Sequence, residues 1–451
     1  MSVNPADSDI YGSLYGTPEM RELFSDSASL QFMLEVEAAL ARAEAKAGLV
    51  PATVADSITA AARVENLNLT RIAESTRNIG YPIVGVVNEL RRLAGEEASR
   101  YIHLGATTQD ILDTALVVQM RQALEYIRRD VLAVARALAD GAVRYRDTPM
   151  AGRTHLQQAV PISFGFKCAG WAGPLPAHLE RLDQASQRMQ VIQFGGAAGT
   201  LASLGADGPA VAEFLADELH LGVPDIPWHT ARDRFAEIAG VLALICGTLS
   251  KFAFDIALLM QTEIAEVSEP HEAYRGASST MPQKRNPIAS EYVIACTRGV
   301  HALARVMLSA MTQDHERATG PWQSERLALP QCFVLTAGAL AHARAIAEGM
   351  IVDTARMRRN LDAGGGLIMA EAIATELTSA IGRAAAHEAV AHACDRAISE
   401  NRPLSEVLRA DAALRLHLAD KAIDRLTDPA RYLGASRVFV DRVVARIRAL
   451  A

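Results

Sequence analysis

Apolar residues recur at the three- and four-residue spacing of an amphipathic helix over most of this 451-residue chain. The stretch 29–47 shows it clearly, because its apolar residues form one broad stripe and its charged residues fall mostly elsewhere. The range 162–192 is also helix-like, but Pro174 and Pro176 predict a kink or a break there. Further long helices without internal proline are predicted over 114–145, 232–267, 288–312 and 331–349. No convincing alternating pattern predicts a strand, and a short hairpin is expected, if anywhere, near 193–202.

Residues that interrupt helices cluster between these segments. Helical patterns longer than about 25 residues are typical of a long bundle rather than of a short-helix globule. We therefore predict an all-α fold of three helical domains, with boundaries near 112 and 355. These are an N-terminal helical domain at 1–112, a central long-helix bundle at 113–355 and a C-terminal helical cap at 356–451.

Composition narrows the possible partners. Half of the residues are hydrophobic but only 5% are aromatic, which suits helix packing better than a β-rich core. The net charge of −7 without long basic runs predicts no nucleic-acid or membrane partner. The most apolar stretch, 238–260, contains Lys251 and Asp255, so a buried bundle helix is expected rather than a membrane span. The N-terminus lacks a signal-peptide pattern and the five cysteines are widely spaced, which favours reduced thiols and a cytoplasmic location.

Three polar islands carry the candidate chemistry. Residues 276–291, GASSTMPQKRNPIASE, form a breaker-rich loop with two serines, a lysine and an amide. Such groups can move a proton and hold a developing anion. A second island, GRTHLQ at 152–157, contains His155, which could be a general acid or base but, taken alone, is more typical of a capping or core histidine. The third, ATTQD at 106–110, reads alone as a helix N-terminal cap, although helix starts also bind carboxylates.

Together and in this order, the three islands resemble the three active-site segments of the fumarase/aspartase superfamily, and the resemblance spans the whole chain. SSTMPQKRNP matches the signature loop GSSxMPxKxNP of that superfamily. One departure is Ala277, where the family usually has glycine: either the alanine stiffens the loop, or Gly276 supplies the lost freedom.

The resemblance implies a mechanism. Ser278 removes a proton from the carbon next to a carboxylate, with Ser279 as the alternative base. Lys284 and Asn286 stabilise the resulting aci-carboxylate, and loop N–H groups help. His155 protonates or orients the leaving group, and Glu291 pairs with this histidine. No metal and no redox cofactor is needed.

The resemblance also implies where a substrate binds. Thr107, Thr108 and Gln157 are expected to anchor substrate carboxylates, and Ser279 and Met281 to contact substrate from the loop. Four arginines could bind a further carboxylate, although each reads equally as a surface ion-pair partner: Arg21, Arg232, Arg317 and Arg326. The expected ligand is a small dicarboxylate or tricarboxylate.

Within the superfamily, the chain resembles the adenylosuccinate lyase and 3-carboxy-cis,cis-muconate cycloisomerase branch. NIGYPIV at 78–84 and PWHTARDR at 227–234 look cycloisomerase-like, and Trp322 and Gln323 replace the serines that hold the nucleotide phosphate in adenylosuccinate lyases. His155 favours a β-eliminating lyase instead, because the cycloisomerases tend to carry tryptophan at this position. Arg326 likewise stands where that branch often has tryptophan.

We therefore expect β-elimination from a substituted succinate, releasing fumarate. Reversible lactonisation of a carboxymuconate is the alternative, and a non-catalytic structural scaffold is a remote third. The resemblance implies a homotetramer with a twenty-helix core, in which three subunits build each active site. Apolar faces along 238–250 fit such an assembly.

Overall fold

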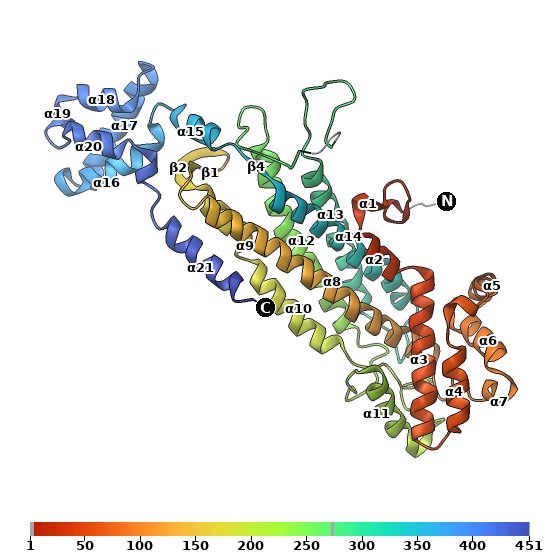
Figure 1. The fold of residues 1–451 in the computed structure, drawn as a ribbon. Coiled ribbons are helices and arrows are strands. Elements are labelled where there is room, and N and C mark those ends of the chain that lie inside the picture. The colour runs from red at the N-terminus through yellow and green to blue at the C-terminus, as the bar shows by residue number, and fades with distance from the viewer. Residues whose placement is uncertain (1–3, 272–274, 451) are drawn as a thin grey trace. The chain divides into compact units, whose positions relative to one another are not determined.

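The computed structural model describes residues 4–271 and 275–450; residues 1–3, which begin the stretch searched for a signal peptide, lie outside it, as do 272–274 and 451. The described chain is mostly coiled ribbon in Figure 1, with two short antiparallel strand pairs. The predicted all-α class is confirmed. The chain divides into two units: residues 1–131, 177–247 and 292–341 form unit 1, and residues 132–176, 248–291 and 342–451 form unit 2. The predicted boundaries near 112 and 355 stay a prediction.

Five helices have residues in both units: α8 (Thr108–Arg144), α10 (Leu175–Met189), α12 (Asp233–Leu259), α13 (Ile288–Ala310) and α14 (Pro321–Gly349). The other helices of unit 1 are α1 (Gly12–Tyr15), α2 (Pro18–Leu23), α3 (Asp26–Lys46), α4 (Ala52–Ala61), α5 (Leu69–Ile79), α6 (Ile83–Ala94), α7 (Glu96–Ser99) and α11 (Gly208–Leu219).

Unit 2 holds the hairpin of β1 (Pro149–Thr154) with β2 (Gln157–Ser163), and an antiparallel pair of two short strands that are distant in sequence, β3 (Val267–Ser268) and β4 (Ile351–Val352). Its other helices are α9 (Phe164–Ala172), α15 (Thr354–Asp362), α16 (Ala370–Ile381), α17 (Arg383–Ser399), α18 (Leu404–Ala410), α19 (Ala412–Arg415), α20 (Asp420–Leu426) and α21 (Ser436–Arg448).

Most predicted helices form where the apolar pattern places them. Helix α3 begins after Ser25, whose hydroxyl accepts the Ala28 N–H as an N-terminal cap, and it buries Leu34 and Leu40. Its apolar stripe packs against α4 and α11 around one hydrophobic core of unit 1. The predicted break at Pro174 is confirmed, because α9 ends at Ala172 and α10 begins at Leu175.

Three boundary predictions are wrong. Helix α12 ends at Leu259 rather than 267, because the chain turns and then forms β3. Helix α14 starts at Pro321 rather than at 331, and it contains Pro330. The hairpin of the chain is β1–β2 at 149–163 rather than one near 193–202. Short polar strands around Pro161 lack the alternation that would have revealed them.

All five cysteines are free and four of them are buried. Burial raises the pKa of the Cys246, Cys296 and Cys332 thiols to about 12. These thiols therefore stay protonated at neutral pH, as inert core residues do.

Candidate active site

The first motif lies at the start of α8, in unit 1. Thr107 directly precedes the helix, and its backbone N–H donates to Asp110 Oδ2 at 3.0 Å. This is the reciprocal half of a capping box, so the predicted helix start is confirmed. The Thr107 hydroxyl remains free of that cap and accepts a hydrogen bond from elsewhere.

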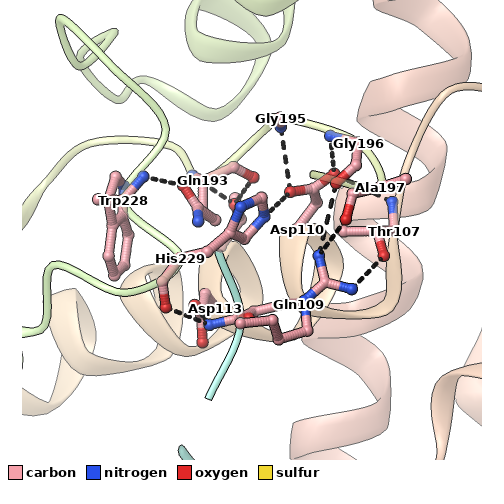
Figure 2. A network of polar contacts seen from close by, with 12 residues as sticks. Thr107, Gln109, Asp110, Asp113, Gln193, Gly195, Gly196, Ala197, Trp228 and His229 are labelled. Carbon is pink, nitrogen blue, oxygen red and sulfur yellow. Dashed lines mark hydrogen bonds and ion pairs between the residues drawn. The ribbon is translucent and has the colours of Figure 1, made fainter. Parts of the chain in front are cut away.

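Asp110 organises the backbone around this helix start. Its buried carboxylate accepts the N–H groups of Gly195 and Gly196 at 3.1 and 2.9 Å, and it lies 2.7 Å from His229 Nε2 (Figure 2). Counting Thr107, four donors surround one carboxylate. The loop that begins at 195 is thereby held against the first motif.

Arg317 is brought to the first motif by the same loop. Its Nη1 donates to Thr107 Oγ1 at 3.0 Å, and its Nη2 donates to the carbonyl of Ala197 at 3.1 Å. Its buried Nε has no partner among the described residues. Two predicted substrate-binding residues, Thr107 and Arg317, therefore meet in the fold.

Arg232 has a different role from the one predicted. Its side chain is 1% exposed and donates to both oxygens of Asp113 and both of Glu325, at 2.6 to 3.1 Å. The two carboxylates use Nε, Nη1 and Nη2, so no edge of the guanidinium is left for a ligand. We correct the substrate-binding prediction for this residue: it is a structural arginine in a buried ion-pair network.

Arg326, in contrast, has no hydrogen bond or ion pair among the described residues, and its buried Nη2 is unsatisfied. Two aromatic rings hold it, with the guanidinium carbon 4.9 Å from the Trp322 centroid and 5.7 Å from that of Tyr81. Burial keeps the pKa of Arg326 below its usual value, against the raising effect of Asp113. The residue still carries its charge at neutral pH.

Arg326 lines a cavity of about 300 Å³ in unit 1. The walls include Phe24, Met33, Leu112 and Trp322. The polar side chains of the lining include Asp26, Asp113 and Glu325, and the last two bind Arg232. Arg326 therefore keeps an unused donor, Nη2, on the cavity wall that a ligand oxygen could accept from.

Arg21, the fourth candidate, lies in α2 and donates weakly to the Ser8 carbonyl at 3.4 Å. A Cβ atom at Gly12 would lie 2.5 Å from its guanidinium carbon, so the glycine makes room for this arginine. Its predicted role in substrate binding stays a prediction.

The second motif forms the turn of the β1–β2 hairpin in unit 2. Thr154 pairs with Gln157, so His155 and Leu156 are the two central residues. Both adopt left-handed backbone conformations, with φ of 50° and 64°. Non-glycine residues in this region carry a strain of about 1 kcal/mol or more each, and such strain clusters at functional sites. His155 is exposed beside Leu156, which is 75% exposed.

The third motif is closed at its base by backbone pairing. Asn286 N donates to Gly276 O at 2.9 Å, and Ala277 pairs with Arg285. Gly276 has φ 66°, and a Cβ there would lie 2.4 Å from Asn286 O. The freedom expected from glycine is therefore located at Gly276, which allows alanine at 277.

Within this loop, the Ser278 hydroxyl oxygen accepts two backbone N–H groups, from Thr280 at 3.2 Å and from Met281 at 3.0 Å. Two such donors would stabilise the alkoxide form of this serine. Ser279, Met281 and Lys284 are exposed, and no hydrogen bond joins Lys284 to Ser278 in the described loop. The assignment of Ser278 as base, with Lys284 and Asn286 as anion stabilisers, stays a prediction.

Glu291 lies in the first turn of α13 and is exposed. Among the residues that the structure describes, neither it nor His155 has a side-chain hydrogen bond or ion pair, so their predicted pairing does not occur within unit 2. A pairing between subunits, as the resemblance implies, stays a prediction, as do the roles of Thr108 and Gln157.

Sequence reading missed four carboxylates or imidazoles that hold the motifs in place: Asp110, His229, Glu266 and Glu269. Asp110 was detectable, since an acidic residue three positions after a cap residue is a capping-box signal. The other three have partners far along the chain, which no local pattern reveals. Residues 4–271 and 275–450 contain no cluster of three or more metal-binding side chains.

Helices α12 and α13 are long and apolar enough to cross a membrane by length and composition alone. Only 44% and 39% of their most apolar windows are buried within the chain. The same test is passed by core helices of soluble proteins, and both helices contribute residues to unit cores here, including Ile245 and Val293.

Comparison with known proteins places these motifs in a family. A family model described as "Lyase" matches residues 15–301, and one described as "Adenylosuccinate lyase C-terminus" matches residues 366–443. The chain is 47% identical to a 3-carboxy-cis,cis-muconate cycloisomerase of Pseudomonas aeruginosa, covering 100% of this chain and 98% of that protein.

Two further relatives define the range of chemistry. The crystal structure of a 3-carboxy-cis,cis-muconate lactonizing enzyme from Pseudomonas putida superposes with a TM-score of 0.93 at 45% identity, covering 98% of this chain and 99% of that one. A nitrosuccinate lyase of Streptomyces davaonensis is 40% identical over 95% of this chain and 92% of its own.

The muconate cycloisomerase and the muconate lactonizing enzyme favour the cycloisomerase alternative over the main expectation, fumarate-releasing elimination. Together with the three motifs and the helical fold, they identify the chain as an enzyme of the lyase family and a member of the fumarase/aspartase superfamily.

Proposed function

We propose that this enzyme interconverts a carboxymuconate and its lactone. The observation that carries the proposal is full-length similarity, at 47% identity, to a protein named 3-carboxy-cis,cis-muconate cycloisomerase. A scaffold without catalysis would be free to lose its reactive groups, yet Ser278, Lys284 and His155 are all present.

The chemistry follows from the signature loop. In the lactone-opening direction, Ser278 takes a proton from the carbon next to a carboxylate, and the C–H electrons pass into that carboxylate to form the aci-carboxylate. Collapse of this anion breaks the ring C–O bond, and the electrons leave on the ring oxygen as a carboxylate tethered to the new alkene. Ser278 takes this proton as the alkoxide, after its own hydroxyl proton has been released to solvent, and Thr280 N–H and Met281 N–H stabilise the alkoxide oxygen. In the reverse direction the carboxylate adds and the carbon is reprotonated.

A carboxylate leaving group needs no general acid, because it departs as a stable anion at neutral pH. The reaction therefore makes little demand on His155. An exposed histidine at a strained turn fits orientation of a substrate carboxylate in this reaction.

Arg326 supports a substrate with several carboxylates. In unit 1, Thr107 with its Arg317 partner suits one carboxylate. The Arg326 guanidinium, with its unsatisfied Nη2 in the 300 Å³ cavity of the same unit, offers a second cation.

Elimination from a substituted succinate is the second candidate. His155 favours it, because an amine-type leaving group needs a proton and the cycloisomerase branch tends to carry tryptophan at this position. A relative named nitrosuccinate lyase, 40% identical, supports the same chemistry.

We further propose a cytoplasmic homotetramer in which three subunits complete each site. Less than half of each apolar window of α12 and α13 is buried within the chain, and Leu244 and Leu308 are more than half exposed. Apolar faces of this kind are covered in oligomers. Sedimentation at working concentration tests this, and an active monomer would contradict it.

Ultraviolet absorbance separates the two reactions. Loss of absorbance from 3-carboxy-cis,cis-muconate indicates that the conjugated diene has closed to a lactone. Rising absorbance with a panel of substituted succinates indicates fumarate release. We expect the first result at a rate far above the second. Turnover of succinates alone would replace the proposal by the second candidate, and inertness towards both classes would defeat both.

A further inference from the structure

Two glutamates flank strand β3 and reach in opposite directions. Glu266 directly precedes the strand and Glu269 directly follows it. Residues three positions apart on an extended segment point to opposite sides. Glu266 is fully buried and Glu269 is 7% exposed, and each carboxylate is satisfied by partners from a different part of unit 2.

Glu266 holds the hairpin that carries His155. Its two oxygens accept from Arg153 Nη1 and Nη2, at 2.9 and 2.7 Å, in a bidentate pair. Asn360 Nδ2 donates to the same carboxylate at 2.8 Å and ties it to α15. Arg153 lies two residues before His155 in β1, next to the bulge between Ala151 and Arg153. A planar bidentate pair fixes orientation as well as distance, so it sets the direction of the strained turn.

Glu269 holds the end of the signature loop. Its oxygens accept Ala289 N–H at 3.0 Å, Ser290 N–H at 2.7 Å and the Ser290 hydroxyl at 2.7 Å. These are the first-turn donors of α13, where a carboxylate also meets the positive end of the helix dipole. Asn286 and Glu291 lie on either side of the capped residues.

The segment between the two carboxylates is itself fixed by backbone bonds. Val267 pairs with Val352 and Ser268 with Ile351, and Glu266 N donates to Leu259 O at 3.1 Å. A short strand anchored in this way fixes the position of one carboxylate relative to the other. The hairpin and the loop base thereby share one rigid support.

We propose that Glu266 and Glu269 are positioning residues, and that the Glu266–Glu269 brace fixes the His155 turn and the base of the Ser278 loop relative to each other. The inference rests on the proposed use of these two motifs in catalysis. Neither glutamate contacts the reacting atoms. Both act through the groups they hold.

The first experiment measures turnover in Glu266→Gln and Glu269→Gln. Misplacing a reacting group by about 1 Å can cost about 100-fold in rate, so we expect kcat to fall by about 10- to 100-fold while KM changes by less than about 3-fold. Asp441→Asn is the matched control, because it removes a bidentate carboxylate partner of Arg146 that touches neither motif. Its kcat should be unchanged. Wild-type kcat in folded Glu266→Gln or Glu269→Gln enzyme would overturn the proposal.

The second experiment needs no substrate and therefore separates failure of the brace from failure of the proposed function. Hydrogen exchange is measured by mass spectrometry over 149–163 and 276–291. The brace predicts that each glutamine variant accelerates exchange in both segments by about 10-fold or more, which corresponds to about 1.4 kcal/mol of lost local protection. Acceleration confined to the segment next to the altered carboxylate would overturn it.

Milder changes keep the test informative if a glutamine variant does not fold. Arg153→Lys keeps the charge but loses the bidentate geometry, and Ser290→Ala removes one of three bonds to Glu269. Each should show the same two-segment pattern at smaller amplitude. A local pattern in both would contradict the brace.

Discussion

Trp322 donates its indole N–H to Asp113 Oδ1 at 3.1 Å, which fixes the ring that carries Arg326. Arg232 also binds Asp113 through two nitrogens. This buried ion pair therefore fixes the aspartate that holds the Trp322 ring against Arg326. One aspartate therefore links the structural arginine to the arginine that we assign to ligand binding.

We expect Arg326→Gln to raise KM for a tricarboxylate substrate by about 10- to 100-fold, since a hydrogen bond to a charged group contributes about 1.5–3 kcal/mol. The kcat should change little, because the residue does not touch the reacting carbon. Steady-state kinetics measure this. Arg63→Gln, an exposed change, is the control. An unchanged KM would remove Arg326 from the site.

Ser278→Ala should lower kcat by about 10³-fold and leave substrate binding nearly intact, because the base is lost and the anion-binding groups remain. Ser279→Ala is the matched control, because within the described loop the Thr280 and Met281 N–H groups donate to the Ser278 hydroxyl and not to that of Ser279. It should retain activity within about 10-fold. Single-turnover kinetics and ligand titration separate the two effects. The reverse ranking would make Ser279 the base.

His155→Gln distinguishes the two reactions through the leaving group. Lactone chemistry should lose less than about 10-fold, whereas elimination of an amine should lose about 10²–10⁴-fold, because only the amine needs a proton. Rates of both conversions are compared in one variant preparation. A large loss with carboxymuconate would show that the histidine also serves the intramolecular reaction.

Glu44 should make stability depend on pH. Burial, with the charge of Glu37 nearby, raises its pKa to about 9, and neither of its oxygens has a partner among the described residues. The folded state therefore keeps a proton that the unfolded chain releases above about pH 4.5, so the free energy of unfolding falls as pH rises from about 4.5 to 9. The loss reaches about 3 kcal/mol by pH 7.

Glu44→Gln removes this titration. The variant should match wild type near pH 4.5 and exceed it increasingly above, as measured by denaturant unfolding at fixed protein concentration. Glu35→Gln, exposed on the same helix, should keep the wild-type pH dependence. Parallel curves for Glu44→Gln and wild type would mean that Glu44 is not protonated in the folded protein.

The helices were predictable because each is specified by its own residues. The stripe in 29–47 and the capping pattern before α8 are local signals, and α3 and α8 form there. The β1–β2 hairpin was not predictable, since its turn carries His155 and Leu156 rather than the glycine or asparagine that left-handed positions favour. Only pairing with the rest of the hairpin holds them.

In the candidate site, too, features with local sequence signals were predictable, and features that depend on distant contacts were not. The residue pattern of the third motif located the signature loop, and Gly276 adopts a left-handed backbone conformation in it. The sequence could not tell which of Arg232 and Arg326 binds a ligand, because both are arginines near aromatic residues. The difference lies in Asp113 of α8 and Glu325 of α14, whose carboxylates form ion pairs with Arg232.

Binding at Arg326 can be followed without turnover. The half-buried guanidinium has one nitrogen, Nη2, without a partner among the described residues, and an anion that accepts a hydrogen bond from it binds the folded state. Ligands that bind only the folded state raise the melting temperature with concentration. A thermal-shift screen of carboxylic acids can therefore find the substrate class without any assay of turnover, and products and unreactive analogues will register as readily as substrates.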